Sequence, residues 1–177
     1  MAIGASIYKA DLNYSDFTQH NYQDFNLTMA KHPSESEERM MYRLIAFCCF
    51  ASEDLMFTKG LSTQDEPEIW QKDLTGDILH WIELGQPDEK RLRQAAGKSK
   101  KVSVFTTNPN TWESYYQKIK NKIPKEKVDI YSIEILENGP LDKIVERTMK
   151  LSCTIEDELM YLGNDELRIA IKCTKLI

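Results

Sequence analysis

The chain has 177 residues, which suits one domain, and its 41% of hydrophobic residues allow a packed core and exclude global disorder. A net charge of −5 excludes the overall basic footprint of a dedicated nucleic-acid binder, so any such surface must be local. The sequence has no apolar stretch near the ~18 residues of a membrane span and begins without a signal-peptide pattern, so we expect a cytoplasmic protein that binds no membrane.

The first part of the chain predicts an antiparallel pair of strands and then a helix. Residues 3–14 and 22–29 both alternate between apolar and polar positions, and polar residues typical of a turn separate them. Ser34 is expected to cap a helix that runs to about Ser52, because Glu37 follows three residues later, as in a capping box. The strand residues expected to share a face are Ile3, Ala5 and Ile7 on the first strand, and Phe25, Leu27 and Met29 on the second.

The rest of the chain alternates strands with helices and ends in strands alone. A short strand at 56–58 precedes a hairpin, whose strands begin near Glu68 and end near Glu83 around a turn at 73–76. This order predicts a mixed α/β domain, with helices on the faces of a partly parallel sheet and extra antiparallel strands from both termini. The later elements are a helix beginning at 87–89, a strand at 101–106, a helix at 111–119, a strand at 128–135, a short helix at 139–147, and strands at 151–155, 159–162 and 167–173.

The four cysteines show no spacing typical of a zinc site or a disulfide framework. Cys48 and Cys49 are adjacent, so they cannot both point at one metal from a helix. Cys153 and Cys173 stand alone in the sequence. We expect reduced, buried thiols.

Two basic stretches are candidates for a local nucleic-acid surface. One runs from Lys118 to Lys127. Each stretch is more often simply the solvated face of a helix, and the nucleic-acid surface is the other interpretation. The other stretch contains Lys90, Arg91, Arg93, Lys98, Lys100 and Lys101.

Carboxylates carry the chemistry that the sequence suggests. Glu83 interrupts the apolar run 78–84, where a carboxylate is costly to bury without partners. The expected hairpin brings Glu68 to the same area, and Glu38 could reach it from the first helix. Carboxylate oxygens bind Mg²⁺ or Mn²⁺, and a metal held in this way activates water and stabilises charge on a phosphodiester. From the residues alone, the favoured alternative is that Glu83 lies in solvent at the end of its strand.

Several stretches of the sequence resemble the YaeQ family of small bacterial proteins. They read HPSESEERMMYRLIAF, FTKGLSTQDEPEIW, WIELGQPDEKRLRQA and RTMKL. The resemblance runs from about Ile3 to the end and implies one YaeQ-like domain over residues 1–177. It also implies the PD-(D/E)XK nuclease-like fold, which is a mixed sheet flanked by helices.

The same resemblance implies roles for individual residues. Pro67 and Glu68 stand at the "PD" position, Glu83 begins the "(D/E)XK" position, and Glu38 matches a helix acid of the superfamily. The three glutamates are therefore the expected ligands of Mg²⁺ or Mn²⁺. Gly85 stands where the superfamily has its lysine, which orients the attacking water or stabilises developing charge. The expected replacements for that lysine are Lys90, Arg91 and Lys101, with Arg39 and Arg43 as further candidates.

Two functions remain open from the sequence. A metal-dependent nuclease would use Glu38, Glu68 and Glu83 with one of the relocated cations. A non-catalytic module would use the same fold to bind nucleic acid or a protein partner, which is consistent with the missing lysine and the acidic composition.

Overall fold

The computed structural model describes residues 4–59 and 64–177. Within those residues, ten strands form one mixed sheet, accompanied by three α-helices and one 3-10 turn. The helical elements are α1 (Glu37–Cys48), α2 (Glu89–Lys98), α3 (Trp112–Ile119) and the 3-10 turn η2 (Leu141–Ile144). The strands are β1 (Ser6–Asp16), β2 (Asn21–Lys31), β3 (Leu55–Phe57), β4 (Ile69–Lys72), β5 (Ile78–Leu84), β6 (Ser99–Thr106), β7 (Val128–Glu137), β8 (Thr148–Glu156), β9 (Leu159–Gly163) and β10 (Arg168–Lys175).

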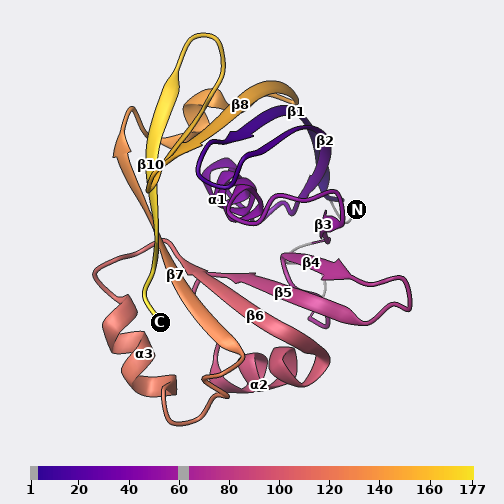
Figure 1. Ribbon diagram of the computed structural model, residues 1–177, viewed down its shortest axis with the longest axis vertical. Coiled ribbons are helices and arrows are strands. Elements are labelled where there is room, and N and C mark those ends of the chain that lie inside the picture. Colours follow the sequence, from indigo (N-terminus) through magenta and orange to yellow (C-terminus); the bar gives the residue numbers. More distant parts are fainter. Residues whose placement is uncertain (1–3, 60–63) are drawn as a thin grey trace.

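The sheet joins both ends of the chain around its middle. Its strand order is β2-β1-β8-β9-β10-β7-β6-β5-β4-β3. The central strands β5, β6 and β7 are parallel, whereas β8, β9 and β10 pair antiparallel with one another. The N-terminal hairpin is attached through a parallel pairing of β1 with β8. The sheet curls around α1, so its two edge strands come to the same side of the molecule (Figure 1).

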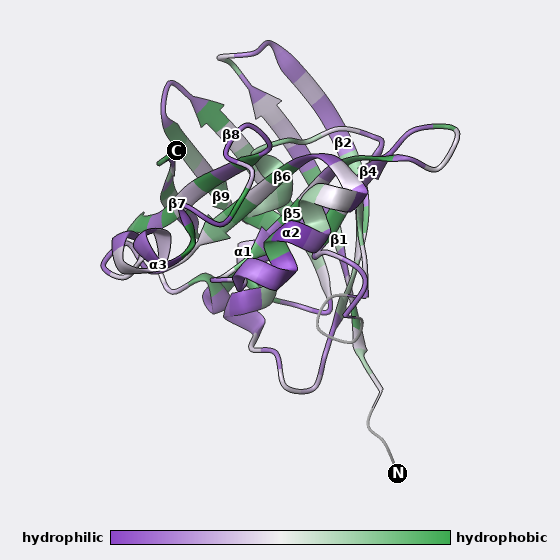
Figure 2. Cartoon of the chain, turned by 90° about the horizontal axis from the view of Figure 1, so that it is seen from below, coloured by the Kyte–Doolittle hydropathy of each residue, from purple (hydrophilic) through white to green (hydrophobic). Residues whose placement is uncertain are grey.

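The helices cover opposite faces of the central strands. α1 packs on the inner side of the curl, and α2 and α3 pack on the other face (Figure 1). Neighbouring residues of β5 therefore enter different cores: Ile82 joins the α1 core and Trp81 the α2–α3 core. Burial on both faces explains why residues coloured as hydrophobic lie along β5 and β6 in Figure 2, whereas α2 is coloured mainly as hydrophilic.

The predicted mixed sheet with helices on its faces is confirmed, including the antiparallel strands contributed by both termini. The last helical segment is shorter than predicted, because η2 ends at Ile144 and the chain is extended again from Val145. None of the helices in the described part of the chain has the length and apolar character needed to cross a membrane.

The buried face of β1 differs from the prediction. Ile7 is 49% exposed, and the residues that face α1 are instead the even-numbered ones. Ile3 lies outside the described residues. Both faces of this strand carry apolar residues in the sequence, so the pattern alone does not identify the buried face. The tyrosines favour the even-numbered face, because Tyr8 and Tyr14 bury their rings there. Their hydroxyl groups donate hydrogen bonds to Glu37 and to the carbonyl of Cys48.

The start of α1 also differs from the prediction. Ser36 is the N-cap, and its hydroxyl accepts a hydrogen bond from the backbone N–H of Arg39 at 3.0 Å. Ser34 hydrogen-bonds the ring of His32 instead, at 2.6 Å. The two-residue shift matters because it places Glu35 before the helix, where its carboxylate can accept hydrogen bonds from side chains in the first turns of α1.

The cysteines are free thiols, as predicted, but they do not stand alone. A hydrogen bond to Cys153 and burial raise the pKa of Cys48 well above its ordinary value. Cys173 and burial do the same to Cys49. At the end of α1, the thiol of Cys48 therefore lies beside that of Cys153 in β8, and the thiol of Cys49 lies beside that of Cys173 in β10.

Candidate functional site

A hairpin of β4 and β5 brings Glu68 and Glu83 together. Gly76 closes the turn with φ +91° and donates its N–H to the carbonyl of Asp73. Ile69 pairs with Ile82 across the two strands. The next residue on each side is a glutamate, so the two acids lie opposite each other at the end of the hairpin far from the turn.

Both glutamates line one cavity of about 510 Å³. Each is only 6% exposed, so the carboxylates are nearly withdrawn from water. Glu68 lies just before β4, and Asp88, the N-cap of α2, lies on the other side of the cavity. The complete lining is Arg39, Gln64, Glu66, Pro67, Glu68, Glu83, Leu84, Gln86, Pro87, Asp88, Lys90, Arg91 and Gln94.

Glu83 is neutralised from α2. Its Oε1 accepts hydrogen bonds from Nε1 of Trp81 and from Nε of Arg91, both at 2.7 Å. Burial raises the pKa of Glu83 above its ordinary value, and the nearby Glu68 adds to the increase. The hydrogen bonds from Trp81 and Arg91 oppose it. The solvent-exposed alternative for Glu83 is therefore wrong, and its burial is made possible by these two donors.

Arg91 has further partners besides Glu83. Its terminal nitrogens donate to the backbone carbonyl groups of Gln64 and Glu66, and its guanidinium lies 5.2 Å from the centre of the Trp81 ring. Arg91 thus joins the start of α2 to the segment that leads into Glu68.

Glu68 is neutralised from α1, on the opposite face of the sheet. Nη2 of Arg39 lies 2.5 Å from its Oε1, and Nε of Arg43 lies 3.8 Å from its Oε2. Within the described residues, Oε2 of Glu68 and Nη1 of Arg43 are buried atoms without a hydrogen-bond partner. An unmade hydrogen bond at a buried carboxylate oxygen is costly, and this oxygen keeps an unused acceptor position.

Glu35 belongs to the same site, although sequence reasoning missed it. Its Oε1 accepts from Nη1 of Arg39 at 2.8 Å and from Nε of Arg43 at 2.9 Å, and its Oε2 accepts from Nη2 of Arg43 at 2.8 Å. The available signal was the spacing of the three residues, at i, i+4 and i+8, which puts Arg39 and Arg43 on one face of α1 and Glu35 just before the helix on the same side. That face is turned toward the hairpin.

Three glutamates and three arginines are therefore linked by ion pairs, and we call this group the acid–arginine cluster. Its closest nitrogen–oxygen pairs are separated by 2.5 to 2.8 Å. The cluster as a whole carries no net charge. Its members are Glu35, Glu68, Glu83, Arg39, Arg43 and Arg91.

Lys90, Glu38 and Lys101 have different positions relative to the cavity. Lys90 is exposed at the cavity and forms no ion pair within the described residues. Glu38 is absent from the described lining and lies near Tyr42, whose pKa is raised by burial and then by Glu38. Lys101 also lies away from it, where its Nζ is 3.3 Å from Oδ2 of Asp129.

Gly85 follows β5 in a backbone conformation that favours glycine. Its φ is +97°, and its N–H donates to the carbonyl of Phe105 at 2.8 Å. A Cβ at this position would meet no atom within 4 Å, so the constraint comes from the backbone and not from space. A lysine here would be strained, which gives a physical reason for its absence.

The donor chemistry of Glu68 and Glu83 fits a small hard cation. Mg²⁺ is commonly held by one or two carboxylates and keeps several waters, and the buried Oε2 of Glu68 has an unused acceptor position. Within residues 4–59 and 64–177, no group of three or more acidic, histidine or cysteine side chains is arranged to hold a metal. The fit is thus to a pair of carboxylates, without Glu38 as a third.

Fold and site define a mixed α+β protein built on one curled sheet with a carboxylate–guanidinium cavity at the end of a hairpin. The sequence matches the YaeQ protein family over residues 1–173, and the chain belongs to that family.

Relatives and solved structures agree with this assignment. The chain is 36% identical to the uncharacterized protein YaeQ of Escherichia coli K12 over 175 residues, which cover 98% of this chain and 97% of that protein. Identity to the Salmonella typhi YaeQ protein is 37% over the same length and coverage. The YaeQ crystal structure from Xanthomonas axonopodis pv. citri matches with a TM-score of 0.89 at 33% identity, over 97% of this chain and 98% of that chain. The YaeQ crystal structure from Pseudomonas syringae matches with a TM-score of 0.85 at 30% identity, over 98% of this chain and 96% of that chain.

Proposed function

We propose that this chain is a cytoplasmic, metal-dependent nuclease-like protein that hydrolyses phosphodiesters in a PD-(D/E)XK type of site. The observation that carries the proposal is the pair of buried carboxylates, Glu68 and Glu83, on neighbouring strands of one cavity, with a carboxylate oxygen left unpartnered. Glu68 and Glu83 would hold Mg²⁺ or Mn²⁺. When bound, the metal would supply an activated water and charge stabilisation at the phosphorus.

The cationic groups of the cavity take the place of the lysine that is absent at Gly85. The requirement is a positive charge near the reacting phosphate, not a particular position in the sequence. Arg91 lies against Glu83, and Lys90 lines the cavity and has no ion-pair partner among the residues that the structure describes. Lys90 and Arg91 would therefore bind and orient the phosphodiester.

A cleavage assay with a charge-removing variant tests this function. The native protein is incubated with single- and double-stranded DNA and RNA in Mn²⁺ or Mg²⁺, and the Glu83→Gln variant with the same substrates. We expect cleavage by the native protein and a loss of at least about a hundredfold in the variant, as for removal of one charge-stabilising group. Glu38→Gln, which changes an acid outside the described cavity lining, is the matched control and should retain full activity. Equal rates in native protein and Glu83→Gln would reject the proposal.

A second function is favoured by a specific observation. Glu68 and Glu83 each already have an arginine partner at 2.5 to 2.7 Å, so the site is balanced without a metal. A non-catalytic module that binds nucleic acid or a protein would need no more than this. Metal-independent binding of a labelled oligonucleotide, with no cleavage of any substrate, would support the module.

A further inference from the structure

The acid–arginine cluster leaves no net negative charge for an incoming cation. A divalent ion at Glu68 and Glu83 would add two positive charges where both carboxylates are only 6% exposed. Uncompensated charge in such a region is expensive. A cation can therefore bind tightly only if the arginines move away from the carboxylates, or if an anion arrives with it.

The three arginines differ in how firmly they are held. Arg43 has a fully buried side chain, which bonds both oxygens of Glu35 and the carbonyl of Ala30. The side chains of Arg91 and Arg39 are 21% and 28% exposed, and both reach the edge of the cavity. Arg91 and Arg39 can consequently move without opening the core, whereas Arg43 cannot.

We propose that Arg91 and Arg39 are exchangeable counter-ions of Glu83 and Glu68. A divalent cation displaces both guanidinium groups from the carboxylates, and the displaced groups bind the oxygens of a phosphate. Cation and oxyanion then bind cooperatively, each raising the affinity for the other by the same factor. This inference rests on the proposed function, because it concerns the regulation of the same metal site.

Both arginines keep other partners during such an exchange. Arg91 still donates to the carbonyl groups of Gln64 and Glu66. Arg39 still has Glu35, at 2.8 Å from its Nη1. These contacts keep the two guanidinium groups at the cavity, where their planar donor sets suit paired hydrogen bonds to phosphate oxygens. The exchange thus needs a side-chain rearrangement alone.

Binding of Mn²⁺ to the full chain tests the exchange without an activity assay. The free ion is followed by electron paramagnetic resonance, whose signal falls as the ion binds. Arg91→Gln removes the competitor for Glu83, and we expect the Mn²⁺ affinity to rise about tenfold, an ordinary coupling between two bound groups. Arg93→Gln removes an exposed arginine of the same helix and should leave the affinity unchanged. An unchanged or weaker affinity in Arg91→Gln overturns the proposal.

Sulfate provides the second arm, as an oxyanion probe compared with chloride at equal ionic strength. The native protein should bind Mn²⁺ several-fold more tightly in sulfate, as expected for cooperative sites. The double variant Arg39→Gln, Arg91→Gln should lose this difference. No sulfate effect in the native protein, or an equal effect in both proteins, contradicts the coupling.

The outcomes also separate this inference from the proposed function. If neither the native protein nor Arg91→Gln binds Mn²⁺, the metal site is absent and both proposals fail. If the native protein binds Mn²⁺, and Arg91→Gln gains nothing, only the exchange fails. Thermal unfolding verifies that each variant is folded. Arg91→Lys, which keeps the charge but loses the fork of donors, is the second variant and should bind Mn²⁺ with intermediate affinity.

Discussion

Arg43 is the residue on which the burial of the acids depends. Its side chain has no exposed surface, and it faces Glu35 and Glu68 together. A buried ion pair contributes little compared with an apolar pair of the same volume, but removing one partner leaves an uncompensated charge in the core. The structure should therefore tolerate the loss of a surface arginine far better than the loss of this one.

We expect Arg43→Met to lower the free energy of unfolding by about 3–5 kcal/mol, the usual cost of breaking a buried pair. Arg93→Met is the matched control, since Arg93 is 61% exposed in its pair with Glu89 and should cost less than about 1 kcal/mol. Urea unfolding of the two variants measures both values. Similar losses in the two variants would show that burial of the Arg43 pair is not what makes it important.

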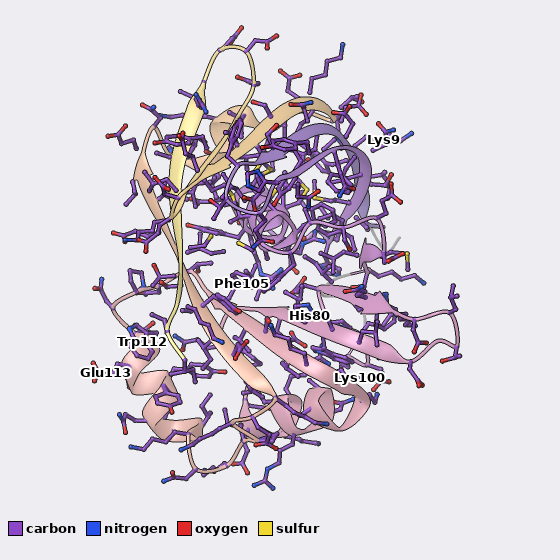
Figure 3. The ribbon with its side chains drawn as sticks, in the orientation of Figure 1. Lys9, His80, Lys100, Phe105, Trp112 and Glu113 are labelled. Atoms are coloured by element: carbon purple, nitrogen blue, oxygen red, sulfur yellow. The ribbon has the colours of Figure 1, made fainter. Side chains whose placement is uncertain are left out.

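His80 is a second buried residue with a consequence for stability. It lies in the interior between α1 and the central strands, as does Phe105 (Figure 3), and its Nε2 is 2.8 Å from Oγ of Ser103. Burial, and after it the charge of Lys101, lower the pKa of His80 to about 4, while Asp129 opposes the change. This environment is that of a buried, structural histidine.

The pH dependence of stability follows from the different pKa of His80 in the folded and unfolded protein. An unfolded histidine takes up a proton near pH 6.5, whereas folded His80 does so only near pH 4, so the unfolded state binds more protons between these values. Its contribution to stability is complete above pH 6.5 and declines as the pH falls to 4, by about 3 kcal/mol in all. His80→Asn should therefore flatten the unfolding free energy between pH 7.5 and 4.5. His20→Asn, at an exposed position, should keep the native pH profile.

At the scale of elements, the β4–β5 hairpin was predictable and its surroundings were not. The turn residues between Glu68 and Glu83 fix the hairpin, so their proximity follows from local chemistry. The contribution of Glu35 depends on which face of α1 meets the hairpin, and that is a long-range contact. Its i, i+4, i+8 spacing with two arginines looks like an ordinary solvated helix face in the sequence.

Gly85 offers a test of how the end of β5 is built. Gly85→Ala places a side chain at φ +97°, and we expect a loss of about 1–2 kcal/mol from backbone strain alone. Gly97→Ala is the matched control, since Gly97 lies exposed in α2 without a positive φ and should gain about 0.5–1 kcal/mol. Opposite signs in urea unfolding are the expected result. A neutral Gly85→Ala would contradict the strain argument.

At the scale of the whole molecule, one sheet separates two hydrophobic cores. Leu44 of α1 lies in one core and Leu92 of α2 in the other, and both are fully buried. The central strands contribute side chains to both cores, so neither core can open without disturbing the same strands. The two cores should consequently unfold as one cooperative unit.

Leu44→Ala and Leu92→Ala test this cooperativity from the two faces. Each should cost about 2–5 kcal/mol, the range for buried leucines. Tryptophan fluorescence and circular dichroism should give one coincident urea transition in both variants. A separate early transition in Leu92→Ala would instead mean that the α2–α3 core is an independent unit.

The joining of the two termini is the part of the fold that the sequence did not reveal. The turns predict the hairpin of β1 with β2 and the antiparallel order of β8, β9 and β10. The parallel pairing of β1 with β8 involves no turn, and its two strands have no complementary pattern that would distinguish it from other pairings. Its selection depends on the whole sheet curling around α1.

That parallel pairing has a consequence for the ribosome-bound chain. Lys9 of β1 pairs with Thr148 of β8, so the inner edge of the N-terminal hairpin has no partner until nearly all of the protein has been made. At usual rates of synthesis, the hairpin would wait on the order of ten seconds with that edge open. An unpaired strand edge invites association with other chains. The nascent protein should therefore be a frequent client of chaperones that shield emerging strands, and slowing translation near its end should increase its aggregation.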